Sequence, residues 1–167
     1  MYSALDIARY VVNYVNSNND SISNLKLQKI LYYIQAAFLV ENGTGCFNDA
    51  ILCWRHGPVI KNVYDEFNQY GDQNIPYQGR RNKFTIQNGR LAIIEEKFSN
   101  DMICQEDKER INKVVNSLMP YDPWFLVDRT HEEEPWKSLS TYNVEITTSN
   151  IEKYFSKHKE RIYGKFN

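Results

Sequence analysis

Apolar residues at the start of the chain recur at the spacing of an α-helix. Within residues 4–16 they fall on one face, and Ser3 can cap a helix whose first turn carries Asp6. The residues on that face are Ile7, Ala8, Val11, Val12 and Val15. A polar run over 16–21 then interrupts the pattern. We therefore expect a first helix over about 4–16.

The clearest helical pattern in the chain comes next. Ser23 or Asn24 is suited to cap it, and Gly43 is suited to end it. Its apolar residues share one face: Leu27, Ile30, Leu31, Ile34 and Phe38. This spacing predicts a second helix with these residues in the core and with Lys26 and Lys29 outside the buried stripe.

The pattern is less regular between residues 47 and 71. Residues 47–54 are mostly apolar without a helical period, so a short strand and a turn of helix are both open. Pro58 suits the first position of a helix because the missing N–H would be unpaired there. We expect a third helix from Pro58 to Tyr70, ended by Gly71.

Polar residues, glycines and prolines dominate from Asp72 to Arg90. Within and after this stretch, Asn88-Gly89 lies between two short apolar runs, 84–86 and 91–94, as in a hairpin with a type I′ turn. The alternative is a helix with Leu91, Ile94 and Phe98 on one face. The sequence leaves a small β-hairpin over 82–95 and this helix open.

The last third of the chain predicts three helices. The first covers 106–118 and ends before Pro120, and Asp122-Pro123 provides a cap and a first helical residue for the next. The last begins near Thr148 or Ser149, with an apolar side formed by Ile151, Tyr154, Phe155 and Ile162.

The fold class that follows is mainly α. The 167 residues, 42% of them hydrophobic, can bury roughly 70% of the surface that the unfolded chain exposes. No internal repeat or long linker divides the chain. We therefore expect one compact domain over residues 1–167, a bundle of about six helices with a small hairpin as the open alternative.

Hydropathy and cysteine content indicate where the protein works. The longest charge-free hydrophobic stretch, Ile30–Val40, is 11 residues long, whereas a membrane helix needs about 20. The N-terminal residues lack the pattern of a secretory signal. Three cysteines without a C-x-x-C pair, Cys46, Cys53 and Cys104, suit a reducing compartment. We expect a cytoplasmic protein with buried thiols and no membrane partner.

No motif predicts catalysis, a metal or a cofactor. His131 is followed by three glutamates, but Pro135 stands where a zinc-protease helix needs its second histidine. The chain has no G-x-S-x-G elbow and no dinucleotide-binding fingerprint. We expect a protein that is not an enzyme, with a hydrolase or transferase that uses His131 and the adjacent carboxylates as the alternative.

Charge argues against nucleic acid as a partner. The formal net charge is −1, so no overall field attracts phosphate backbones. The last helix does carry a basic flank, composed of Lys153, Lys157, Lys159, Arg161 and Lys165. Aromatic residues recur beside it at helical spacing, which favours amphipathic packing over DNA binding.

Two compact segments combine a tryptophan, a proline and polar groups. The first, 54–59, reads Trp-Arg-His-Gly-Pro-Val, and the second, 130–136, reads Thr-His-Glu-Glu-Glu-Pro-Trp. Such a mixture is found in protein-recognition surfaces and also in rigid turns that a buried indole locks. The sequence alone leaves both interpretations open.

In their order along the chain, these segments resemble the Panacea antitoxin domain family, also described as SocA-like or phage-associated GepA-like. The resemblance rests on 27–33, on the Trp-Arg-x-Gly-Pro-Val element at 54–59, on the Thr-His and Pro-Trp pairs within 130–136, and on Ile-x-x-Tyr-Phe at 151–155. It is weakest over 72–100.

The resemblance implies a mainly helical antitoxin that binds and neutralises a toxin protein encoded by an adjacent gene. It also implies an alternative, an adaptor that delivers the toxin to a Clp-type protease, and a setting in prophages or phage defence. We expect the contact surface or its support to include Trp54, Arg55, Gly57, Pro58, His131, Glu134, Pro135 and Trp136. Which toxin is bound and which oligomer forms stay open.

Overall fold

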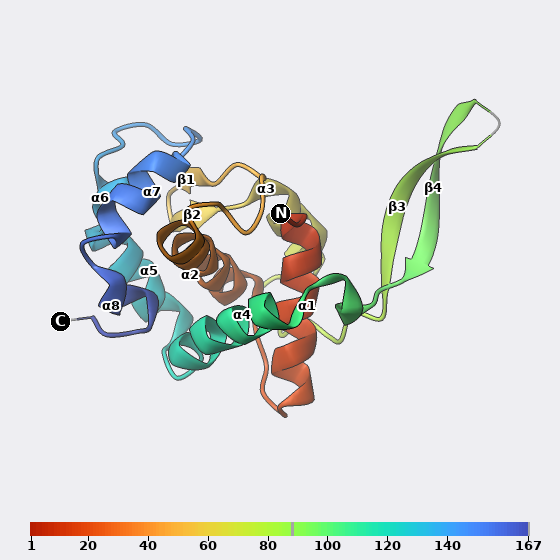
Figure 1. Cartoon of the computed structure of the whole chain (residues 1–167), viewed down its shortest axis with the longest axis horizontal. Coiled ribbons are helices and arrows are strands. Elements are labelled where there is room, and N and C mark those ends of the chain that lie inside the picture. The colour runs from red at the N-terminus through yellow and green to blue at the C-terminus, as the bar shows by residue number, and fades with distance from the viewer. Residues whose placement is uncertain (88, 167) are drawn as a thin grey trace.

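The computed structural model describes residues 1–87 and 89–166, and within them the chain forms eight α-helices and two hairpins (Figure 1). The helices are α1 (Ala4–Ser17), α2 (Asn24–Asn42), α3 (Lys61–Phe67), α4 (Gln105–Leu118), α5 (Pro123–Glu132), α6 (Glu134–Lys137), α7 (Thr148–Phe155) and α8 (Lys159–Ile162). Two short 3₁₀ helices, η1 (Asn68–Tyr70) and η2 (Asn100–Met102), follow α3 and precede α4. The fold is mainly α, as the sequence predicts.

Helix α2 lies at the centre of the helical body (Figure 1). It packs against α1, α3, α4, α5, α7 and α8, and against the short strand β2 (Gly57–Val59). The predicted stripe is buried, and Leu27, Ile30, Leu31 and Ile34 are fully enclosed. The placement of Lys26 and Lys29 outside the stripe is wrong, because both are buried. A helix surrounded on all sides has no solvent-facing side for them.

The buried polar residues of α2 hold the neighbouring loops in place. The Gln28 side chain accepts a hydrogen bond from the Ile60 amide at 2.8 Å, and the Lys26 ammonium donates to the Met119 carbonyl at 2.6 Å. The Gln35 side chain accepts from the Cys46 amide, again at 2.8 Å. A buried polar group needs such partners to offset its desolvation. The polar positions of α2 therefore fix the loops around it.

The first hairpin pairs β1 (Leu52–Trp54) with β2 (Gly57–Val59), and Cys53 lies opposite Pro58. A short strand within 47–54 is thereby confirmed over a turn of helix. The prediction that Pro58 begins the third helix is wrong, since α3 starts at Lys61 and Pro58 lies in a strand. Its missing N–H is tolerated in so short a hairpin.

The second hairpin pairs β3 (Arg80–Gln87) with β4 (Arg90–Lys97) and extends away from the helical body (Figure 1). This confirms the hairpin over the helical alternative for 91–98, and the strands are longer than predicted. In the predicted Asn-Gly turn, Gly89 has a φ of +73°, whereas Asn88 lies outside the described residues.

Six predicted helices have counterparts, and the described chain has two more. Helix α6 was not predicted, and the predicted last helix is divided into α7 and α8. The chain leaves α7 at Ser156 and turns at His158, where φ is −133° and outside helical values. As predicted, Asp122 caps α5 by accepting a hydrogen bond from the Trp124 amide at 2.8 Å.

The three cysteines differ in exposure. Cys46 and Cys53 are buried as expected, but Cys104 is exposed, and the expectation of three buried thiols is wrong for it. Cys104 stands in front of α4 as its N-cap residue, at the surface end of the helix. In the part of the chain that the structure describes, every helix is too short or too polar to traverse a lipid bilayer.

Candidate functional site

The two motif segments of the sequence meet in the structure, about eighty residues apart along the chain. The Trp136 indole N–H donates a hydrogen bond to the Trp54 carbonyl at 3.0 Å. The His131 ring stacks on the Trp136 ring with centroids 3.9 Å apart and planes inclined by 15°, and it hydrogen-bonds to the backbone of Arg55. His131 and Trp136 therefore fix the β1–β2 turn by bonding to its backbone.

The β1–β2 turn rests on buried groups of α2 and α5. The Lys29 ammonium donates to the Pro58 carbonyl at 3.0 Å, and Gly57 adopts a φ of +95°. A Cβ atom on Gly57 would lie 2.6 Å from Thr130 Oγ1 and 2.9 Å from Lys29 Cε. Glycine is required here both for its backbone conformation and for the close approach of its neighbours.

Burial beneath the β1–β2 turn lowers the pKa values of the basic side chains that support it. Burial lowers the pKa of Lys29 to about 7, because the charged ammonium loses its hydration. Burial, followed by the nearby charge of Lys29, also lowers the pKa of His131. Both effects favour neutral side chains beneath the turn near pH 7.

A buried ion pair anchors the second motif segment to the C-terminal helix. Glu133, which is fully buried between α5 and α6, accepts hydrogen bonds from Arg161 Nε at 2.9 Å and from the Tyr33 hydroxyl at 2.9 Å. Burial raises the pKa of Glu133 to about 7, although Arg161 and Tyr33 act in the opposite direction. Arg161 also donates to the Arg129 carbonyl at 3.1 Å. The segment is thereby tied to α2 and α8.

A cavity of about 410 Å³ lies beside the β1–β2 turn, and we call it the aromatic cleft. Its lining includes Trp54, Arg55, His56, Val59, Tyr64 and Trp124. Trp54 packs edge-on against Tyr64 with centroids 5.0 Å apart, and His56 packs in the same way against Trp124 at 5.1 Å. Arg55 and Trp124 are exposed, and the described residues provide no ion pair for Arg55.

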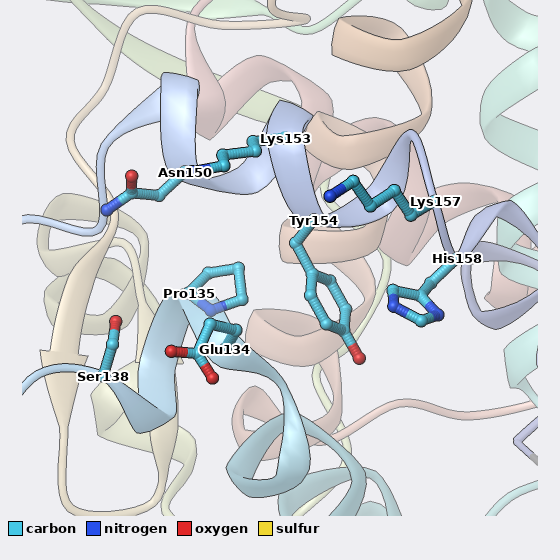
Figure 2. A pocket seen from close by; sticks show the side chains of 8 residues that line it. All are labelled: Glu134, Pro135, Ser138, Asn150, Lys153, Tyr154, Lys157 and His158. Carbon is cyan, nitrogen blue, oxygen red and sulfur yellow. The ribbon is translucent and has the colours of Figure 1, made fainter.

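A second cavity, of about 480 Å³, is lined by residues of α6 and α7 and of the turns that follow them. Figure 2 shows its lining side chains, with Glu134, Pro135 and Ser138 from α6 and its end, and Asn150, Lys153, Tyr154, Lys157 and His158 from α7 and the turn after it. Glu134 is exposed and Pro135 is buried. Although these two residues are close in sequence to Trp136, they line a different cavity from Arg55.

The predicted site residues therefore take three positions. Trp54 and Arg55 line the aromatic cleft, whereas Gly57, Pro58, His131 and Trp136 build the turn and its support. Glu134 and Pro135 line the second cavity. Trp124 was missed, because its place in the first turn of α5 does not by itself indicate that its ring is exposed beside the β1–β2 turn. Arg161 was assigned to a basic flank, and no local pattern indicates its pairing with Glu133.

The chemistry of the site favours binding. Glu133 is engaged by Arg161 and Tyr33, and the buried Nε2 atom of His131 has no hydrogen-bond partner, so the alternative of a His131–carboxylate pair gains no support. Across residues 1–87 and 89–166, no group of three or more His, Cys, Asp or Glu side chains could hold a metal ion. An apolar cleft with an exposed guanidinium at its rim is typical of a recognition surface.

Comparison with known proteins assigns the class. The model of the family described as Antitoxin SocA-like, Panacea domain, matches residues 27–137, which include both motif segments and most of the central helix. The chain belongs to this family. Among named proteins it is similar to Antitoxin SocA of Caulobacter vibrioides (strain NA1000 / CB15N), with 43% identity over 54 residues. That match covers 32% of this chain and 29% of the relative. No solved structure matches the chain.

Proposed function

We propose that this protein is the antitoxin of a toxin–antitoxin pair and neutralises its toxin by binding it directly at the aromatic cleft. Membership of the antitoxin family supports the general role. The single observation that carries the binding site is the turn at Arg55. Groups from α2, α5 and α6 fix its backbone, while Arg55 itself stays exposed and without an ion pair in the described chain.

The physical reason for this assignment is preorganisation. A rigid turn loses little conformational entropy when a partner binds, and that entropy is one of the main costs of association. Trp54 and Trp124 supply aromatic surface beside Arg55, and tryptophan and arginine are the residues most enriched in binding hot spots. In this proposal His131 and Trp136 are positioning residues, and Arg55 and Trp124 contact the toxin.

Co-expression with the product of the adjacent gene tests the proposal. We expect the chain to restore growth of cells that express the toxin and to co-purify with it. Arg55→Ala and Trp124→Ala should each weaken the complex at least about tenfold. Lys61→Ala is the matched control, since Lys61 is exposed on α3, pairs with Asp65 and does not line the cleft. It should bind as the wild type does.

The outcomes separate the function from the site and from the adaptor alternative. Full rescue by folded Arg55→Ala and Trp124→Ala variants would reject the cleft as the contact surface. Toxin that disappears only in cells with an active Clp-type protease would favour delivery to the protease over masking. A neighbour that is harmless and forms no complex would count against the antitoxin function itself.

A further inference from the structure

The β3–β4 hairpin carries an uncovered apolar face. In the strand register Phe84 pairs with Ile93 and Ile86 pairs with Leu91, so the alternation of a strand places all four side chains on one face. Their exposed fractions are 67% for Phe84, 63% for Ile93, 75% for Ile86 and 73% for Leu91. We call these four residues the hairpin face. An isolated two-stranded hairpin is only marginally stable in water, so a face of this kind calls for a covering surface.

The base of the hairpin is firmly attached to the body, although the hairpin face is not covered. The buried Asn13 side chain of α1 accepts a hydrogen bond from the Gln78 amide at 2.6 Å and donates one to the Gln78 carbonyl at 3.0 Å. Arg81 forms ion pairs with Asp6 at 2.7 Å and with Glu96 at 2.6 Å. These contacts attach the base of the hairpin to α1, and Figure 1 shows the hairpin projecting from the helical body.

The charge of the hairpin is opposite to that of the rest of the chain. Residues 80–97 contain five basic residues and two glutamates, a net charge of +3, within a chain of net charge −1. On the same side as the hairpin face, Arg80 and Glu95 form an exposed ion pair. Lys97, which pairs with Arg80 in the strand register and lies on the same side, is exposed as well. An apolar strip with an excess of positive charge at its margins favours a surface with negative charge around an apolar centre.

We propose that the hairpin face docks the toxin, on an apolar surface of the toxin that is rimmed by aspartate and glutamate side chains. The proposal rests on the proposed antitoxin function and adds a second contact region to the aromatic cleft. A second copy of this chain is disfavoured, because two stacked hairpins would bring two units of net charge +3 together. Nucleic acid is disfavoured because phosphates would leave the four apolar side chains uncovered.

The test uses the full-length chain and the purified product of the adjacent gene. In the double variant Ile86→Thr, Leu91→Thr, two facing apolar side chains become polar while β-propensity is kept. We expect the Kd of the toxin complex, measured by calorimetry, to rise at least about tenfold. The matched control is Thr85→Val, Ala92→Thr, a facing pair on the opposite side of the hairpin, which should bind as the wild type does.

A charge variant and a mass measurement complete the test. Lys97→Glu, a charge reversal on the same side as the hairpin face, should weaken the complex at low salt and reduce the dependence of its Kd on salt. An unchanged Kd for the double variant, with intact binding by the wild type, would overturn the proposal and leave the antitoxin function standing. A free chain that is dimeric by light scattering, and becomes monomeric in the double variant, would assign the face to a second copy and also overturn it. If the wild type does not bind, the proposed function fails and this proposal with it.

Discussion

The two hairpins of this protein have the same topology and opposite surroundings. In β1–β2 the turn residue Gly57 touches Thr130 and Lys29, and the residues before β1 and in β1 also hydrogen-bond to the 143–146 segment. In β3–β4 nothing lies within 4 Å of a Cβ atom placed on Gly89, and the apolar side chains of one face are exposed. The short hairpin is an integral part of the core, whereas the long hairpin is an appendage held at its base.

The difference shows that a sequence motif and an exposed apolar surface need not coincide. Within the Trp-Arg-His-Gly-Pro-Val segment, Gly57 and Pro58 are occupied with internal contacts, whereas Trp54, Arg55, His56 and Val59 line the aromatic cleft. The β3–β4 segment has no such motif, although the family model spans it, and it exposes four apolar side chains on one face. Structural demands therefore account for Gly57 and Pro58 of the motif, whereas the exposed apolar face of the long hairpin lies outside any motif.

The largest expected effect comes from the two turn glycines. Gly57→Ala should lower the free energy of unfolding by about 3 kcal/mol, because the added methyl group would clash with Thr130 and Lys29 at a strained φ of +95°. Gly89→Ala should cost only about 1 kcal/mol, the price of a positive φ without a clash. Urea unfolding followed by circular dichroism measures both. Equal losses would show that the two turns are equally constrained.

The second effect concerns the charge beneath the short hairpin. The pKa of Lys29 in the folded protein is about 7, below the value of about 10.4 expected for the unfolded chain. Between these values the unfolded chain holds more protons, so the contribution of Lys29 to the free energy of unfolding rises with pH by up to about 1.4 kcal/mol per pH unit. This contribution is lost as the pH falls through 7.

Lys29→Met isolates that contribution. The difference in Tm between the wild type and the variant should move in favour of the wild type as the pH is raised from 7 to 9. Lys61→Met, which removes an exposed lysine, serves as the control and should show no such trend. A pH-independent difference for Lys29→Met would mean that Lys29 stays charged in the folded protein.

The smallest effect is expected on the long hairpin. Phe84→Ala should change the free energy of unfolding by about 0.5 kcal/mol or less, since the side chain is exposed and supports no core. Phe67→Ala, at a fully packed position of α3, should cost about 3–5 kcal/mol in the same urea titration. A large loss for Phe84→Ala would show that the hairpin face is covered within the free chain.

Local signals in the sequence predicted most of the helices. Ser23 and Gly43 bound α2, and Asp122 with Pro123 begins α5, because caps depend on neighbouring residues alone. The position of α2 in the fold could not be predicted in this way. Its lysines resemble surface residues until the six surrounding helices are known.

The candidate site could be predicted only in part, for the same reason. Two segments with the right residue types were identified, but which of their side chains reach the surface depends on contacts between distant elements. The bond from Trp136 to Trp54 and the pairing of Glu133 with Arg161 join residues that no sequence period relates. Likewise, the Asn-Gly turn made the hairpin one of two open alternatives, and the exposure of Phe84 depends on the path of the rest of the chain.

The distribution of tryptophan has a practical consequence. All three tryptophans of the chain, Trp54, Trp124 and Trp136, lie around the β1–β2 turn, and the β3–β4 segment has none. The intrinsic fluorescence of the protein therefore reports on the surroundings of a single turn. A toxin that enters the aromatic cleft should shift the emission spectrum, whereas contact restricted to the hairpin face should leave it nearly unchanged. With a toxin variant that lacks tryptophan, the unlabelled chain can thus distinguish engagement of the two regions in a single optical titration.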